Sequence, residues 1–251
     1  MFSKLIWQTD RMLYEDLIFR LEQVPSDNWY GQAFFRLFKR KRIVDKYQEF
    51  FLRHEDFHPK NIFELGIFDG GSIAFWFELF KPNKHIAIDF LDREDSRYFE
   101  EYIQSRGLAD KIKTYWKTDQ SDKDTLRKIV SAEFTNPLDL VIDDASHMYL
   151  PTRASFETLF PLMKPRGLYI IEDWAWGHWP QYIAEEHLWS KIESPTKFIT
   201  KLIEAAGTSV SVISNISITK GFVVVERGEE IIADPTSFNI DNYIIKRPNL
   251  I

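Results

Sequence analysis

Hydrophobic positions along the chain follow two spacings, one typical of buried strands and one typical of amphipathic helices. Short apolar runs predict parallel strands at 62–66, 85–90, 112–118, 138–144 and 168–173. Between them, helical spacing predicts helices at 72–80, 96–106, 123–130, 151–163 and 195–206, with a turn at 164–167. Two further runs, 210–219 and 222–226, predict a hairpin. The alternation predicts an α/β fold, a doubly wound and mostly parallel sheet with an antiparallel C-terminal hairpin.

The first 58 residues have a different pattern. Apolar residues at helical spacing, among them Leu13 and Leu17, predict a helix over 11–24. A second helix is predicted over 31–53, a segment rich in Phe and in Lys and Arg. We therefore expect a helical N-terminal appendage at 1–58 and an α/β domain at 59–251.

Composition narrows the classes of function. The net charge of −6 and the pI near 5.6 argue against a nucleic-acid partner. The chain has no cysteine, so a metal would have to be bound by oxygen or imidazole ligands. The sequence has neither an apolar stretch long enough for a bilayer nor the pattern of a signal peptide. We expect a soluble, cytoplasmic protein without a membrane partner.

Glycines gather between the first parallel strand and its helix, at Gly66, Gly70 and Gly71. Glycine lets the backbone approach a ligand closely, and the helix that begins near Ser72 favours an anionic group such as a carboxylate. The spacing differs from the Gly-x-Gly-x-x-Gly fingerprint of dinucleotide-binding folds. Glu64, two positions before the first glycine, is placed to accept a hydrogen bond from a ligand ammonium. The loop therefore favours a cofactor that carries an amino acid.

Polar residues that follow the next two strands fit the rest of such a cofactor. Asp89 ends the second strand, where a carboxylate commonly binds the hydroxyl pair of a ribose. Both NAD and S-adenosylmethionine carry adenosine, so this residue indicates the ribose and leaves the chemistry open. Asp119 and Gln120, after the third strand, are candidates for contact with the adenine amino group.

Acidic residues close the fourth and fifth strands, Asp143 and Asp144 in one and Glu172 and Asp173 in the other. Carboxylates that converge at one sheet edge repel one another unless a cation lies between them, and oxygen ligands favour Mg²⁺, or Mn²⁺ or Ca²⁺ as substitutes. Successive strand residues point to opposite faces, so we place Asp143 nearer the cofactor. The predicted metal ligands are Asp144, Glu172 and Asp173. Glu172 and Asp173 are adjacent, and both can ligate only if the backbone curls there.

His147 lies on the loop just after these acids and is the candidate general base. A metal that coordinates a hydroxyl lowers the pKa of that hydroxyl, and a nearby imidazole can then take the proton. Trp174, Trp176 and His178 follow the metal acids directly and are weaker candidates to line a substrate pocket. Packing under a long loop accounts for the tryptophans equally well.

Three blocks of residues together resemble the macrocin/mycinamicin sugar O-methyltransferase and cephalosporin hydroxylase-like family: Glu64-Leu65-Gly66 with Gly70-Gly71-Ser72, Asp143-Asp144-x-Ser146-His147, and Ile171-Glu172-Asp173. The resemblance covers about residues 61–173. It implies the Rossmann-like, seven-stranded fold of class I methyltransferases, with S-adenosyl-L-methionine as cofactor.

The same resemblance implies Mg²⁺ held by the three predicted metal ligands, His147 as base, and a sugar hydroxyl of a natural product as acceptor. It also implies a homo-oligomer, with the N-terminal region contributing to substrate cover and assembly. Ala145 departs from the family pattern, which leads us to expect glycine there.

Other functions remain open at this point. A metal-dependent O-methyltransferase that acts on catechol-type phenols would suit the aromatic residues after the fifth strand. An NAD-dependent oxidoreductase is opposed by the missing glycine fingerprint and by Glu64. A catalytically silent protein that acts as a binding or assembly partner is opposed by the complete set of acids and by His147.

Overall fold

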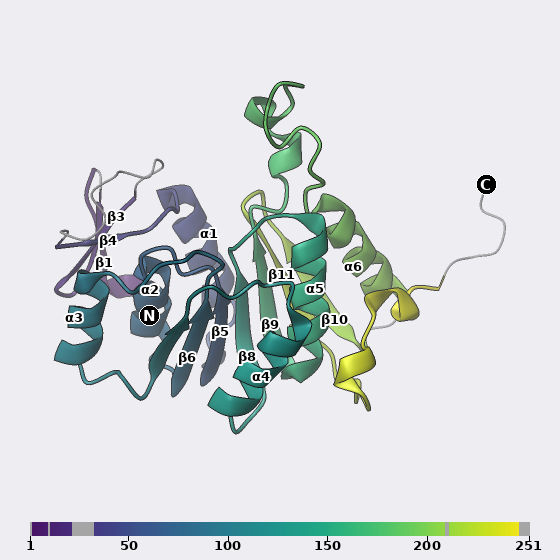
Figure 1. Cartoon of the computed structure of the whole chain (residues 1–251), viewed down its shortest axis with the longest axis horizontal. Helices are drawn as coiled ribbons and strands as arrows, with labels where there is room; N and C mark the ends of the chain where they lie inside the picture. The colour runs from purple at the N-terminus through teal and green to yellow at the C-terminus, as the bar shows by residue number, and fades with distance from the viewer. Residues whose placement is uncertain (1, 10, 22–32, 209–210, 246–251) are drawn as a thin grey trace. The chain divides into compact units, whose positions relative to one another are not determined.

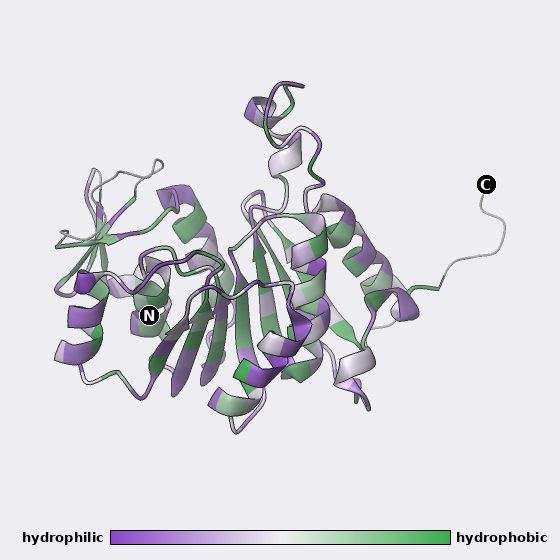
Figure 2. Cartoon of the chain, in the orientation of Figure 1, coloured by the Kyte–Doolittle hydropathy of each residue, from purple (hydrophilic) through white to green (hydrophobic). Residues whose placement is uncertain are grey.

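A computed structural model describes residues 2–9, 11–21, 33–208 and 211–245. The chain divides into two compact units, Met1–Thr118 and Asp119–Ile251 (Figure 1). Seven strands belong to a mostly parallel sheet, which confirms the predicted α/β fold. Hydrophobic residues are concentrated on these strands, and polar residues on the outer faces of the helices (Figure 2).

The first unit contains three parallel strands in the order β5-β6-β7. All five residues of β5 are buried, as expected for a strand covered on both faces. Ser96 caps α3 by accepting a hydrogen bond from the Phe99 amide. The strands and helices of this part lie close to their predicted positions: β5 (Asn61–Leu65), α2 (Gly71–Phe80), β6 (Lys84–Ile88), α3 (Arg97–Ser105) and β7 (Ile112–Tyr115).

The N-terminal segment contains a small sheet where helices were predicted. In the described part of this segment, a short 3₁₀ helix and four strands precede an α-helix: Phe2–Lys4, β1 (Leu5–Trp7), β2 (Arg11–Tyr14), β3 (Leu17–Arg20), β4 (Phe35–Arg36) and α1 (Lys41–Leu52). The first three strands pair antiparallel, and β4 pairs parallel with β3.

The predicted helix over 11–24 is therefore wrong at 11–21, and residues 22–24 lie outside the described residues. Burial alternates along β2 and β3, with Met12, Tyr14, Leu17 and Phe19 buried, so the true period is two. A tight turn at Glu15, whose φ is 54°, lets Leu13 and Leu17 mimic helical spacing. The helix predicted over 31–53 is confirmed only at α1; residues 31 and 32 lie outside the described residues.

Aromatic side chains join this N-terminal sheet and α1 to α2 and α3 within the first unit. Phe19 contacts Phe75 with ring centroids 6.0 Å apart, and Phe51 contacts Trp76 at 6.1 Å. The described part of residues 1–58 is therefore packed within the first unit, and the units divide after Thr118. A separate role for residues 1–58 stays a prediction.

The second unit holds the strand order β10-β11-β9-β8. β8 and β9 pair parallel, while β11 pairs antiparallel with both β9 and β10, which confirms the C-terminal hairpin. Its main elements are α4 (Lys123–Glu133), β8 (Leu138–Asp143), α5 (Tyr149–Leu159), β9 (Met163–Glu172), α6 (Thr196–Thr208), β10 (Ile213–Ile218) and β11 (Phe222–Arg227). Short 3₁₀ helices lie at Phe160–Leu162, Trp176–His178, Pro180–Tyr182, Pro235–Ser237 and Ile240–Tyr243.

The turn predicted at 164–167 lies inside β9. Pairing with β8 shifts register between Leu138↔Met163 and Leu140↔Leu168, so the extra residues form an irregularity in a continuous strand. Arg166 adopts a positive φ of 63° in this irregularity. Among the described residues of both units, the structure has no helix with the length and hydropathy needed to span a membrane.

Candidate functional site

The glycine loop of the first unit contains two residues whose backbone favours glycine. Gly66 has a φ of 102° and Gly70 a φ of 81°. Gly71, the first residue of α2, packs against the N-terminal sheet: a Cβ added there would lie 2.0 Å from the carbonyl oxygen of Arg36. At this position glycine is required by the neighbouring backbone of β4.

Asp89, the predicted ribose ligand, is hydrogen-bonded to the backbone of the same loop. One carboxylate oxygen accepts hydrogen bonds from the amides of Ile67 and Phe68, at 2.9 and 3.0 Å. The other accepts from the amide of Leu91 at 2.9 Å. Asp89 therefore fixes the loop conformation in addition to any contact with a cofactor, and its role toward a ribose stays a prediction.

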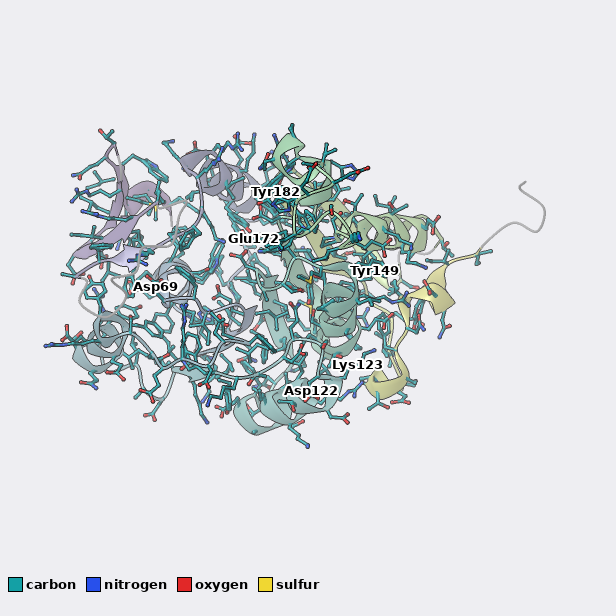
Figure 3. All side chains as sticks on the ribbon, turned by 45° about the horizontal axis from the view of Figure 1, so that its top comes forward. Asp69, Asp122, Lys123, Tyr149, Glu172 and Tyr182 are labelled. Atoms are coloured by element: carbon teal, nitrogen blue, oxygen red, sulfur yellow. The ribbon has the colours of Figure 1, made fainter. Side chains whose placement is uncertain are left out.

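Asp69 is a residue of this loop that the sequence analysis missed (Figure 3). It is buried, and its two oxygens accept from the amides of Arg36 and Gly71, both at 3.0 Å. Burial raises the pKa of Asp69 to about 6, and the two amide bonds oppose that rise. The only signal in the sequence was an acid among closely spaced glycines.

Glu64 is predicted to bind the amino-acid part of a cofactor, and this role stays a prediction. The side chain is fully buried, and Oε2 lies 2.9 Å from Nε2 of His85. Oε1 has no hydrogen-bond partner among the described residues, and neither has the buried hydroxyl of Ser72 at the start of α2. A free carboxylate oxygen suits an ammonium, and a free hydroxyl at a helix N-terminus suits a carboxylate. These donors and acceptors match the two ends of an amino acid.

The predicted adenine contacts lie in the second unit. Gln120 is buried, and its Oε1 accepts from the amide of Ser146 at 2.8 Å. Its Nε2 donates to Oδ1 of Asp143 at 3.1 Å. Asp119 is exposed and accepts from the amide and hydroxyl of Ser121. Gln120 therefore braces the loop after β8, and an adenine contact by either residue stays a prediction.

Asp143, predicted to lie near the cofactor, is buried in a polar network at the end of β8. Its Oδ2 accepts from the hydroxyl of Ser155 at 2.9 Å and from that of Tyr169 at 3.4 Å. Burial raises the pKa of Asp143 to about 6, against the effect of these hydrogen bonds. The network joins α5, β8 and β9.

The predicted metal ligands lie at the carboxyl ends of β8 and β9. Asp143 pairs with Ile171, so continuation of the parallel register places Asp144 beside Glu172. Asp173 has a φ of 47°, which supplies the backbone curl that ligation by both Glu172 and Asp173 requires. The donors are all oxygen, as Mg²⁺ prefers.

The described residues contain no group of three acidic or imidazole side chains placed to hold a metal ion. Like-charged carboxylates repel one another when no cation lies between them. The predicted set therefore has suitable chemistry and neighbouring positions, and its use as a metal site stays a prediction.

His147 lies next to Asp144 with a left-handed backbone, φ 54°. Its Nε2 is 3.7 Å from Oδ1 of Asp144, and the His147 side chain is 20% exposed. The indole of Trp176 donates to the His147 carbonyl at 2.5 Å. The candidate base is thus partly accessible and is held by an anchor from the segment after β9.

The segment after β9 extends beyond the strand ends of the second unit (Figure 1). Its sequence is rich in aromatic residues. Trp176 is buried and contacts Trp189 and Tyr182, with centroids 5.0 and 5.4 Å apart. Tyr182 (Figure 3) stacks on Trp189 and was not a sequence candidate. Trp174 donates from its indole to the Thr219 carbonyl. Both predicted tryptophans therefore serve to hold the segment in place.

His178, the third substrate candidate, is exposed and borders a cavity of about 590 Å³. The other lining residues come mainly from α6 and the turn before it, among them Glu193, Ser194, Thr196, Lys197 and Lys201. The side chains that line this cavity carry hydroxyls and charged groups of both signs.

A known family matches the part of the chain that contains both the glycine loop and the candidate base with its neighbouring acids. The family model described as "Methyltransferase domain" matches residues 63–174. Residues 63–174 are thus similar to a methyltransferase domain. The matched segment begins next to Glu64 and ends just after Asp173, so it includes the glycine loop, His147 and the predicted metal ligands.

Curated relatives of this domain are sugar O-methyltransferases. The chain is 34% identical over 113 residues to 8-demethyl-8-α-L-rhamnosyl tetracenomycin-C 2′-O-methyltransferase of Streptomyces olivaceus, covering 45% of the chain and 26% of that protein. It is 34% identical over 113 residues to mycinamicin VI 2″-O-methyltransferase of Micromonospora griseorubida, covering 45% and 25%. Identity to demethylmacrocin O-methyltransferase of Streptomyces fradiae is 33% over 128 residues, covering 48% and 29%. The matches thus span between 25 and 29% of these relatives' length.

Solved structures support the fold. The MycE methyltransferase of the mycinamycin biosynthetic pathway, in complex with Mg, SAH and mycinamycin VI, aligns with a TM-score of 0.55 and 25% identity, covering 72% of this chain and 49% of that one. The O-methyltransferase TomG of Streptomyces achromogenes, in complex with SAM, aligns with a TM-score of 0.51 and 16% identity, covering 73% and 80%. The second likeness shows the fold alone.

Proposed function

We propose that the protein is a metal-dependent O-methyltransferase that moves the methyl group of S-adenosylmethionine to a sugar hydroxyl of a glycosylated natural product. The observation that carries this proposal is the matched segment 63–174, in which the amino-acid-binding features of the glycine loop occur together with Asp144 and His147. The sugar O-methyltransferases among its relatives supply the acceptor class.

In this proposal the residues of the first unit bind the cofactor. Oε1 of Glu64, buried and without a partner among the described residues, accepts a hydrogen bond from the ammonium of the methionyl group. The Ser72 hydroxyl and the free backbone amides at the N-terminus of α2 donate hydrogen bonds to its carboxylate. When bound, S-adenosylmethionine supplies the electrophilic methyl group.

Residues of the second unit prepare the acceptor. Asp144, Glu172 and Asp173 would hold the metal, which when bound lowers the pKa of a coordinated hydroxyl. His147 takes the proton from the acceptor hydroxyl at Nε2, and Asp144 at 3.7 Å stabilises the resulting imidazolium. The acceptor oxygen then forms its bond to the methyl carbon as the carbon–sulfur bond breaks.

The first experiment is calorimetric titration of S-adenosylmethionine into the purified protein, with and without Mg²⁺, and with NAD as a control. Binding of S-adenosylmethionine, followed by methyl transfer to glycosylated natural products detected by mass spectrometry, would support the proposal. Transfer to catechols alone would replace the sugar by a phenol as acceptor. If the protein bound neither S-adenosylmethionine nor NAD, an assembly partner would be favoured. Binding of NAD alone would favour an oxidoreductase.

The base assignment has a test of its own. We predict that His147→Ala abolishes methyl transfer while the affinity for S-adenosylmethionine changes less than about threefold, since general bases commonly contribute a hundredfold or more. The matched control is His58→Ala, at an exposed histidine outside the site. Equal turnover in His147→Ala and the wild type would eliminate His147 as the base.

The proposal includes a homo-oligomeric, cytoplasmic protein in which residues 1–58 assist substrate cover or assembly. Light scattering coupled to size-exclusion chromatography tests the oligomeric state, and a monomer at all concentrations would remove that part.

A further inference from the structure

A buried pair of ionisable side chains lies within the parallel sheet of the first unit. Glu64 on β5 and His85 on β6 are both fully buried, and their Oε2 and Nε2 atoms are 2.9 Å apart. Ile62 pairs with His85 and Glu64 with Ala87, so the two side chains lie on the same face of the sheet. His85 belongs to none of the sequence blocks that suggested the function.

Each member of the pair has one atom without a partner among the described residues, Oε1 of Glu64 and Nδ1 of His85. Leaving a buried carboxylate oxygen without a donor costs free energy, and such groups persist where they have a task. The strand position of Glu64, two residues before Gly66, places it at the entrance to the glycine loop. The imidazole of His85 is the hydrogen-bond partner of the other oxygen of Glu64.

We propose that His85 is a positioning residue for the ammonium of the cofactor. Its Nε2–H donates to Oε2 of Glu64, which fixes the carboxylate and leaves Oε1 free to accept from a ligand ammonium. A carboxylate that is already oriented loses less conformational entropy when the ligand binds, so the contact gains affinity. This inference rests on the proposed function, because it requires a cofactor with an amino-acid group.

The competing explanation is that the pair only stabilises the sheet. The two explanations differ in what they predict for ligands with and without an α-amino group. A positioning role affects the amino group alone, whereas a stabilising role affects protein stability and all nucleotide ligands together. The ratio of affinities for SAH and for the SAH analogue with hydrogen in place of the α-amino group therefore separates them.

The experiment measures this ratio by calorimetry in the wild type, His85→Gln, His85→Asn and Glu64→Gln. Glutamine can place an amide donor near the position of Nε2, whereas asparagine is too short to reach Glu64. We expect the wild type to prefer SAH by about tenfold or more, as a charge-assisted hydrogen bond allows. His85→Asn and Glu64→Gln should lose most of this preference while they bind the analogue as before, and His85→Gln should keep it.

Each outcome decides something. An unchanged ratio in His85→Asn, or an equal loss of affinity for both ligands, would overturn the positioning role. No binding of SAH to the wild type would overturn the proposed function together with this inference. Thermal unfolding of each variant identifies loss of fold, and if His85→Asn does not fold, equal ratios in His85→Gln and Glu64→Gln would contradict the inference.

Discussion

The Asp69 side chain connects two segments of the first unit by accepting hydrogen bonds from their backbone amides. Its carboxylate accepts from the amide of Arg36 in β4 and from that of Gly71 in α2. Burial raises its pKa to about 6, compared with an ordinary value near 4 in an unfolded chain. Because the folded-state pKa is the higher one, the contribution of Asp69 to stability is complete below about pH 4 and is lost as the pH rises through about 6.

We predict that Asp69→Asn removes this pH dependence, because asparagine does not ionise. A shift of about two pKa units corresponds to roughly 3 kcal/mol, so the difference in unfolding free energy between the two proteins should change by that order between pH 4 and pH 8. The variant also loses one hydrogen-bond acceptor. This loss shifts the unfolding free energy by the same amount at every pH and adds no pH dependence. Urea unfolding across this range measures the effect.

The control is Asp124→Asn, which alters an exposed carboxylate of α4. Its stability should follow the wild type at every pH. Parallel curves for Asp69→Asn and the wild type would contradict the assigned cause.

At the scale of elements, prediction succeeded where each apolar run had one explanation. β5 and β8 are buried along their whole length, so an uninterrupted apolar run sufficed to find them. β2 and β3 are joined by a tight turn, and the spacing across it coincides with a helical repeat. The N-terminal sheet was therefore misread because its pattern fits two periods.

The candidate site shows the same limit. Local motifs made Glu64, Asp144 and His147 candidates, because glycines or acids at strand ends surround them. The partners of these residues come from elsewhere in the chain: His85 lies one strand away, and Trp176 reaches the His147 carbonyl from beyond β9. Such contacts depend on strand order and loop path, which no local spacing encodes.

Gly71 offers a test of how closely α2 and β4 are packed. We predict that Gly71→Ala lowers the unfolding free energy by about 1–3 kcal/mol, because the new Cβ would lie 2.0 Å from the Arg36 carbonyl. The matched control is Gly207→Ala in α6, where an added Cβ meets nothing within 4 Å. That variant should gain up to about 1 kcal/mol from helix propensity. Urea unfolding of both variants measures these changes. Equal unfolding free energies of Gly71→Ala and Gly207→Ala would show that β4 moves freely to make room for the new Cβ.

At the scale of the whole molecule, the proposed chemistry falls inside the matched segment 63–174. The parts outside it include the N-terminal sheet, the aromatic segment after β9 and the C-terminal hairpin. Under the proposed function, residues that determine the acceptor preference are best sought there. The cavity beside His178 and α6 is the first place to examine.

Metal binding is a property of the whole molecule that can be measured without an acceptor. The chain carries a net charge of −6, and Asp144, Glu172 and Asp173 are sequence or register neighbours at the strand ends. A cation there relieves their repulsion and binds the folded protein better than the unfolded chain. We therefore predict that Mg²⁺ raises the unfolding temperature and that a chelator reverses the rise.

At a concentration one hundredfold above its dissociation constant, such a ligand adds about 2.7 kcal/mol, which corresponds to roughly 5–10 °C for a chain of this size. Asp144→Asn should lose most of the rise in scanning calorimetry, because one ligand and one negative charge are removed. Asp56→Asn, at an exposed carboxylate in the first unit, should keep it. If Mg²⁺ stabilised the wild type and both variants equally, the cation would be bound elsewhere on the acidic surface. The metal would then have no part in activating the acceptor, and His147 would have to act on the hydroxyl unaided.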